Sequence, residues 1–386
     1  SGLSIALTLI FEHSELASLA ASIDQLGGRC TDERPVIQGL SQENIGYPLS
    51  FAQQRLWFVQ SMDIDDSRYN MTSLLLISQS VDIKSLEQAC LMLTRRHTVL
   101  RTRFSQDNQS KEGVRQIIDV VPDNFLQCLE LKDTDVDSKQ EFINQASVHA
   151  HAIADQAFDL TQSPLWRAVL ISDGNARCAT QHVLSITLHH IVADGWSMSL
   201  LVRELAALYQ HYSYPNSAQS IPLARLSIQY SDYAQWQRVM LQGAYLEKLS
   251  QYWQQHLAGA SDVLNLNTDR PRSKEASFEG QRLHCELSSE LTVAIKGTAR
   301  AHGVTPYMLM LSAFNIALFE HTKEEDLVVG TDLANRSQHE VEALIGFFVN
   351  VLPIRTKLTG NPTFSQVLKR VKTATLGVYA HQDMPF

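Results

Sequence analysis

The stretch LHHIVADGWS, at residues 188–197, places two histidines, an acid and a glycine at fixed spacing. Before it, residues 182–188 carry leucine or isoleucine at every second position, which is the period-2 pattern of a strand. After it, leucines from Leu201 to Leu208 recur at helical spacing, and Ser197 is the predicted N-cap of that helix. The two histidines are therefore predicted to lie at a strand-to-helix turn, where a scaffold can present a side chain to a cleft.

Composition and charge argue against several classes of protein. The 386 residues are 44% hydrophobic and 19% charged, and no apolar run approaches the ~18 residues of a membrane span. The net charge of −9 argues against a nucleic-acid partner, which requires a basic face. The five cysteines are scattered, which argues against a zinc site or a disulfide framework and fits a reducing compartment. We therefore predict a cytoplasmic globular protein that binds no nucleic acid, membrane or metal ion.

The patterns outside the histidine stretch predict mixed helices and strands, of the α/β or α+β class. Ser50 and Gln53 have the spacing of a capping box at a helix start. Residues 99–104 alternate between two faces, as in a strand. Further helices are predicted over about 227–257, 289–301 and 306–321, followed by a β-rich run at 326–331.

The His-His-x-x-x-Asp-Gly spacing of residues 189–195 resembles the active-site motif of nonribosomal peptide synthetase condensation domains. The wider superfamily, which includes chloramphenicol acetyltransferase, shares this motif. Further segments resemble the same family in the same order and extend the resemblance over about residues 45–386. They are residues 48–58, 96–104, 158–167, 230–237, 345–355 and 381–386.

This resemblance implies a fold of two chloramphenicol acetyltransferase-like lobes, arranged in a V around a central tunnel. The lobes are expected at residues 48–220 and 221–386. The second lobe is expected to be incomplete, because the family's final motif is lacking. Residues 1–26 resemble the last helices of a carrier domain, and residues 27–47 are predicted to be a linker, with Gly and Pro and little periodicity.

The reaction implied by the resemblance is amide formation between two tethered substrates. The amine of an aminoacyl thioester on a downstream carrier attacks the acyl or peptidyl thioester on an upstream carrier. The partners are those two peptidyl carrier domains and an adjacent adenylation domain. The carriers bring 4'-phosphopantetheine arms, and no cofactor of the chain's own is expected. The sequence of residues 50–58 and 96–104 resembles the subtype that joins an L-donor to an L-acceptor.

The resemblance makes His190 the predicted catalytic residue. Neighbouring strand residues point to opposite faces, so His189 is expected to turn into the protein and serve a structural role. A neutral imidazole at position 190 can accept a hydrogen bond from the attacking amine. Whether His190 acts as a base or as a positioning group stays open at this point. Gly195, without a side chain, is expected to leave room for substrate beside the histidine.

Asp194 has two interpretations, as a second acid/base group or as a structural carboxylate, and we favour the structural one. The resemblance suggests Arg101 as its partner in a buried ion pair that holds the turn. Trp196, Ser197 and Asn350 are candidate tunnel-lining residues. For Trp196 packing is the preferred alternative, and for Asn350 the alternative is a satisfied amide in the core.

Two other functions remain alternatives to standard condensation. One is a modified condensation domain that dehydrates or otherwise alters a carrier-bound residue. The other is a noncatalytic platform that only binds carriers or recruits a tailoring enzyme. The intact His190, Asp194 and Gly195 argue against the platform.

Overall fold

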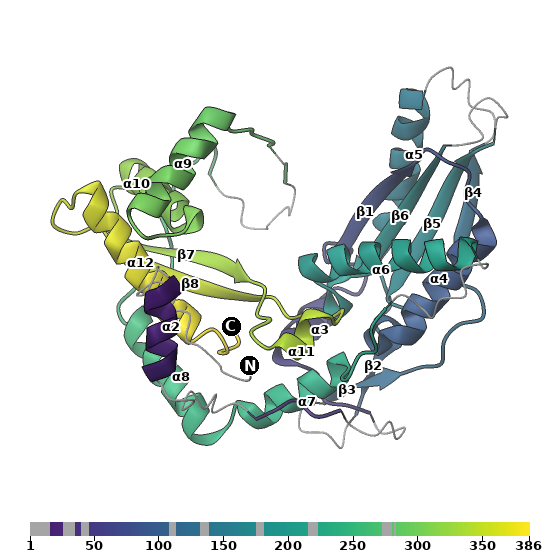
Figure 1. The fold of residues 1–386 in the computed structure, drawn as a ribbon, viewed down its shortest axis with the longest axis horizontal. Coiled ribbons are helices and arrows are strands. Elements are labelled where there is room, and N and C mark those ends of the chain that lie inside the picture. The colour runs from purple at the N-terminus through teal and green to yellow at the C-terminus, as the bar shows by residue number, and fades with distance from the viewer. Residues whose placement is uncertain are drawn as a thin grey trace.

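A computed structural model describes residues 16–25, 35–39, 46–107, 113–131, 139–174, 181–214, 223–271, 280–281 and 283–386. Helices and strands are mixed along the chain, which confirms the predicted class. Figure 1 shows two groups of elements, each built on its own sheet, with α7 (Tyr230–Met240) lying between them at the base of the view. The pair formed by β2 (Thr102–Gln106) and β3 (Val114–Ile118) lies below the right-hand group. Of the expected carrier remnant, only α2 (Leu16–Gln25) is described. The proposed division at residues 220 and 221 stays a prediction.

The first group is built on a sheet of four strands in the order β1-β6-β5-β4. Strand β6 is antiparallel to both of its neighbours, whereas β4 is parallel to β5. The predicted strand at 182–188 is confirmed as β6, and its side chains are buried on both faces from Val183 onward. The strands are β1 (Asn70–Ile77), β4 (Gln127–Leu131), β5 (Trp166–Asp173) and β6 (His182–His189).

Helices cover both faces of this sheet (Figure 1). One face of β5 and β6 packs in a small core with α5 (Lys139–Ala154). The other face belongs to the larger core, which includes the apolar sides of α4 (Ile83–Arg96) and α6 (Gly195–Ser213). The sheet is therefore held rigidly from both sides, which fixes the end of β6 where the histidines lie.

The predicted start of the helix at Ser50 is confirmed, whereas the predicted start of the strand at residue 99 is not. The predicted capping box at Ser50 is confirmed, and α3 (Phe51–Met62) follows it. The strand predicted from residue 99 begins later, because the chain first forms the 3-10 helix η1 (Thr98–Arg101). Strand β2 (Thr102–Gln106) begins where its partner β3 (Val114–Ile118) becomes available for pairing.

The chain after residue 227 begins with α7, between the two groups, and supplies the helices of the second group. The single helix predicted over 227–257 is two helices, broken at Leu241 and Gln242, and Gly243 takes a φ of +54° there. The helices predicted at 289–301 and 306–321 are confirmed. The helices are α7 (Tyr230–Met240), α8 (Gly243–Leu257), α9 (Ser289–Ala301), α10 (Pro306–Thr322), α11 (His339–Glu342) and α12 (Phe364–Ala380).

Strands β7 (Asp326–Leu333) and β8 (Asn350–Lys357) form the antiparallel pair of the second group. Between them the chain leaves this pair, and residues 341–348 pack in the core of the first group. This crossing segment, residues 334–349, brings second-group residues against the end of β6.

Within the described ranges, no single helix is long and apolar enough to cross a bilayer. Helices α9 and α10 have the required length and apolar character only as a pair, and the pair is bent by 101°.

Candidate active site

The end of β6 places the two histidines on opposite sides of the strand. The His189 amide donates to the Leu165 carbonyl at 3.0 Å, and the His190 amide donates to the Tyr69 carbonyl at 2.8 Å, so both neighbouring segments hold the backbone. His189 is fully buried, whereas His190 is partly exposed and lines a cleft. The strand alternation thus separates the two rings as predicted.

The His190 ring has a defined orientation. Its Nδ1 lies 2.8 Å from the Ala193 carbonyl oxygen, which can only accept a hydrogen bond. Nδ1 therefore carries the proton in the neutral ring, and the lone pair resides on Nε2. Phe347 packs against the ring with centroids 4.7 Å apart. The turn thus presents Nε2 as a hydrogen-bond acceptor. The Ala193 carbonyl and the Phe347 ring hold the imidazole in this orientation.

His189 holds the turn in its neutral form. Its Nδ1 accepts from the Ile191 amide at 3.1 Å, and its Nε2 lies 3.3 Å from the Gln60 amide oxygen. Burial, with a smaller effect from the charge of His190, lowers the pKa of His189 to about 3, and Asp66 acts in the opposite direction. His189 is therefore uncharged at neutral pH and fixes the 3-10 turn η2 (His190–Val192).

Asp194 is the N-cap of α6 and half of a buried ion pair. Its Oδ1 accepts from the Ser197 amide at 2.8 Å, and its Oδ2 accepts from the Phe348 amide at 3.1 Å. The Arg336 guanidinium lies 3.2 Å from Oδ1, and both side chains are almost fully buried. These contacts give Asp194 a structural function and join α6 to the crossing segment.

Two sequence predictions about this turn are wrong. The N-cap of α6 is Asp194 and not Ser197. The cation paired with Asp194 is Arg336 and not Arg101, which instead donates to the Asp119 carbonyl. The reason is local: Arg101 lies in η1, where its carbonyl also accepts from the Asp119 amide, and this keeps its side chain at the end of β3.

Trp196 and Ser197 also hydrogen-bond the start of α6 to the crossing segment. Trp196 is half-exposed and lines the cleft beside His190, and its indole N–H donates to the Glu342 carbonyl at 3.1 Å. Ser197 is fully buried and does not line the cleft, because its hydroxyl accepts from the Gly346 amide at 3.0 Å and from Arg336 at 2.9 Å. Ser197, a candidate tunnel-lining residue, instead hydrogen-bonds the start of α6 to the crossing segment.

The cleft at His190 lies between the two groups of elements and measures about 640 Å³. A Cβ added at Gly195 would meet nothing within 4 Å, so there is open space beside His190 as the missing side chain predicted. The walls come from α3, the end of β6, the start of α6, the end of β7 and the start of β8. They are formed by Arg55, Leu56, Val59, Tyr69, His190, Asp194, Gly195, Trp196, Asp332, Ala334, Phe347, Val349 and Val351.

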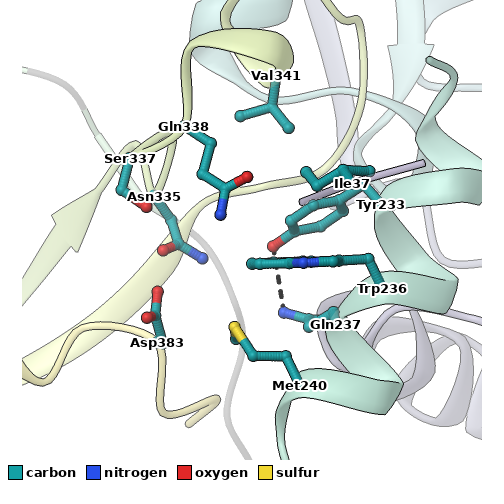
Figure 2. A pocket seen from close by; sticks show the side chains of 10 residues that line it. All are labelled: Ile37, Tyr233, Trp236, Gln237, Met240, Asn335, Ser337, Gln338, Val341 and Asp383. Carbon is teal, nitrogen blue, oxygen red and sulfur yellow. Dashed lines mark hydrogen bonds between the residues drawn. The ribbon is translucent and has the colours of Figure 1, made fainter. Parts of the chain in front are cut away.

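A smaller cavity lies between α7 and the crossing segment. Figure 2 shows Tyr233 and Trp236 of α7 facing Asn335 and Gln338, with Ile37 of the N-terminal segment beside them. The amide of Gln237 donates to the Tyr233 hydroxyl at 3.2 Å, the bond dashed in Figure 2. This cavity is too small for an aminoacyl group and accommodates about one water molecule.

Asn350 lines a neighbouring small cavity and not the cleft at His190. Its side-chain nitrogen donates to the carbonyls of Gln382 and Met384, at 3.0 and 2.6 Å. It therefore holds residues 382–386 against the start of β8, as a satisfied buried amide. That cavity shares Arg55 and Val349 with the His190 cleft, so the two spaces adjoin.

A known protein family covers both groups of elements and the cleft between them. The model of the condensation domain family matches residues 43–386. The chain belongs to the condensation domain family of nonribosomal peptide synthetases. Domains of this family form peptide bonds in such synthetases, and this chain is an enzyme domain of that class.

The condensation domain is 37% identical over 387 residues to malpinin synthetase of Mortierella alpina. That alignment covers 100% of this chain and 5% of the synthetase, so the chain spans a small part of its relative. An X-domain from teicoplanin biosynthesis, solved as a complex with OxyB, superposes with a TM-score of 0.78 at 27% identity, over 92% of this chain and 74% of that one. The first condensation domain of the calcium-dependent antibiotic synthetase, with a substrate analogue, shares the fold at a TM-score of 0.70 and 21% identity, over 88% and 75% of the two chains.

Sequence reasoning missed the residues by which the crossing segment completes the condensation domain's site. Arg336 is a lone arginine in a segment without periodicity, so no spacing pointed to it. It donates to the carbonyls of Val341 and Leu344 and stacks 4.0 Å from the Phe348 ring, in addition to pairing with Asp194. The apolar run that begins at Gly346 was a visible signal, but its contact with residues 194–197 depends on the tertiary fold.

Proposed function

We propose that the cleft at His190 joins an acyl or peptidyl thioester on an upstream carrier to an aminoacyl thioester on a downstream carrier. The amine nitrogen forms the new C–N bond, the C–S bond breaks, and the proton lost by the amine is balanced by protonation of the released thiolate. The observation that carries this proposal is the His190 Nε2 lone pair in a cleft with open space at Gly195.

His190 accepts a hydrogen bond from the attacking amine in this scheme. A group in this position contributes either by taking the proton or by stabilising the charge that develops on nitrogen. Its Nδ1 bond to Ala193 and its contact with Phe347 keep the ring from rotating, so the acceptor is oriented before substrate arrives. Because thioesters are already activated, the main contribution of the protein to the rate is the orientation of the two reactants.

The substrates are proposed to enter a tunnel between two lobes, at residues 48–220 and 221–386. Support comes from the cleft walls, which are contributed by α3 and α6 on one side and by β7 and β8 on the other. Two 4'-phosphopantetheine arms, one from each neighbouring peptidyl carrier domain, would meet at His190. An adjacent adenylation domain would load the acceptor. The L-donor and L-acceptor subtype rests on the sequence of residues 50–58 and 96–104.

The test is condensation between two loaded carrier domains by the His190→Ala variant. We expect the rate to fall by about 10²-fold or more, the lower end of what acid–base groups contribute, with an unchanged melting temperature. His149→Ala, at an exposed histidine of α5, is the matched control and should retain the wild-type rate. A folded His190→Ala variant that condenses at the wild-type rate would refute the assignment.

A second candidate function is a platform that binds carriers without transfer. The X-domain that was solved as a complex with OxyB resembles this chain, and that complex favours a platform that recruits a second protein. Intact-protein mass spectrometry of the carriers separates the candidates. Transfer of the acyl chain supports condensation, loss of water supports the modifying alternative, and unchanged carriers that still bind support the platform.

A further inference from the structure

We infer that Asp332 makes the condensation domain select a substrate with a cationic side chain. The inference rests on the proposed function, because it concerns the substrates of the same cleft. Asp332 lies next to the end of β7, opposite Val351 in the β7–β8 ladder, and both residues line the cleft that contains His190. Its side chain is exposed.

Asp332 differs from the other carboxylate that lines the cleft, Asp194, because no ion pair neutralises it in the described part of the chain. Among the described residues, the charged side chains that line it are Arg55, Asp194 and Asp332, with His190 as the titratable group of the turn. Asp194 is buried and neutralised by Arg336 at 3.2 Å. No ion pair within 4.0 Å joins Arg55 to Asp332 in the described part of the chain, and each is exposed.

Arg55 is not confined to the His190 cleft. It also lines the adjoining cavity, where Asp383 supplies a carboxylate. Asp332 lines the His190 cleft and neither of the two smaller cavities described above. The β7–β8 wall of the cleft therefore carries a carboxylate that no ion pair within 4.0 Å neutralises in the described part of the chain.

The surroundings of Asp332 define the shape of its ligand. Ala334, Val349 and Val351 give the same wall short apolar side chains. An aliphatic chain can lie along such a surface while its charged end reaches a polar group, as lysine side chains do. The chemistry that fits is an ammonium or guanidinium at the end of an unbranched chain. An acidic side chain of the same length would be repelled.

The experiment compares lysyl with norleucyl substrates, since norleucine keeps the aliphatic chain and lacks the ammonium. One arm places the pair on the upstream carrier and the other arm places it on the downstream carrier, which tells donor from acceptor. We expect a preference for lysyl of roughly threefold to fivefold in kcat/KM in one arm, the range of a partly exposed ion pair. The preference should shrink as ionic strength rises.

Asp332→Asn should abolish this preference, and Asp332→Lys should reverse it toward a glutamyl substrate. Asp262→Asn is the matched control, because it removes one exposed carboxylate outside the cleft and should keep the preference. A melting temperature equal to that of wild type shows that Asp332→Asn is folded. Equal lysyl and norleucyl rates in wild type, in both arms, would overturn the inference and leave the proposed function intact. If no carrier-bound pair condenses at all, the proposed function fails and the inference fails with it.

Discussion

At the scale of single residues, the two adjacent histidines have opposite tautomers. His189 Nδ1 accepts from a backbone amide, so its proton is on Nε2. His190 Nδ1 faces a backbone carbonyl, so its proton is on Nδ1. One ring is thereby committed to holding η2, and the other offers its free nitrogen to the cleft. The backbone of a three-residue turn assigns these two functions.

The buried His189 predicts a pH dependence of stability. Its folded-state pKa is about 3, below the ordinary 6.5, because burial disfavours the charged ring. Between about pH 6.5 and 3 the unfolded chain binds a proton that the folded chain does not. The free energy of unfolding should therefore fall as the pH drops through this window, by at most about 1.4 kcal/mol per pH unit for this ring.

Urea unfolding at several pH values measures this effect. His189→Gln should show a shallower fall than wild type below pH 6.5. His149→Gln, at an exposed position, should keep the wild-type slope. His97, whose pKa is also lowered by burial, acts in the same direction in every variant. Identical slopes for wild type and His189→Gln would show that His189 is not the titrating group.

At the scale of elements, the N-terminus of α6 and the crossing segment stabilise each other through one ion pair. Removal of one partner of a buried pair typically costs about 3–5 kcal/mol, because the other charge stays buried without compensation. Asp194→Ala and Arg336→Ala should each lower the free energy of unfolding by this order. The double variant should cost less than the sum, as for residues in direct contact.

Arg101 supplies the control for this cycle. Because it bonds to the Asp119 carbonyl and not to Asp194, the Asp194→Ala and Arg101→Ala costs should add. Chemical denaturation of the single and double variants gives both coupling energies. A coupling between Asp194 and Arg101 that matched the coupling between Asp194 and Arg336 would contradict the pairing.

The first residue of α6 predicts a steric block of the cleft. Gly195→Trp should leave folding intact and abolish condensation, because the added ring would occupy the open space beside His190. Gly195→Ala should fold and retain much of the activity, since its Cβ meets nothing within 4 Å. The measurement is condensation of loaded carriers, with circular dichroism as the folding check. Normal turnover by a folded Gly195→Trp variant would remove this space from the substrate path.

Gly346 is the contrasting glycine in the crossing segment. A Cβ there would lie 2.0 Å from a ring carbon of Tyr230, so Gly346→Ala is expected to destabilise the fold, unlike Gly195→Ala. The two glycines thus have different uses: one leaves room for a ligand, and the other allows close packing.

Periodicity accounts for what the sequence predicted at this scale. The alternation of residues 182–188 and the helical patterns of 289–301 and 306–321 are local, and the strand and both helices formed as expected. The break at Leu241 was missed, although Gly243 marked it, because the helical pattern continues on both sides. The Asp194–Arg336 pair spans 142 residues, and no local pattern reports a contact of that kind.

At the scale of the whole molecule, the crossing segment ties the two groups of elements together at the reaction site. After β7 the chain enters the larger core with Val341, Leu344, Ile345, Phe347 and Phe348 before it returns as β8. The walls of the His190 cleft therefore come from distant parts of the chain held by one continuous packing. This arrangement suits two substrates that reach one point from different partners.

Carrier dependence is the prediction that belongs to this scale. Tethering converts the encounter of two thioesters into a local event, and an effective concentration gained in this way is worth roughly 10²–10⁴-fold. The same aminoacyl groups presented as free coenzyme A thioesters should therefore condense at least about a hundredfold more slowly than on paired carriers. His190→Ala run with free thioesters is the control that identifies uncatalysed aminolysis. Free thioesters that react as fast as carrier-bound ones, in a His190-dependent manner, would instead indicate an acyltransferase that recognises its substrates without carriers.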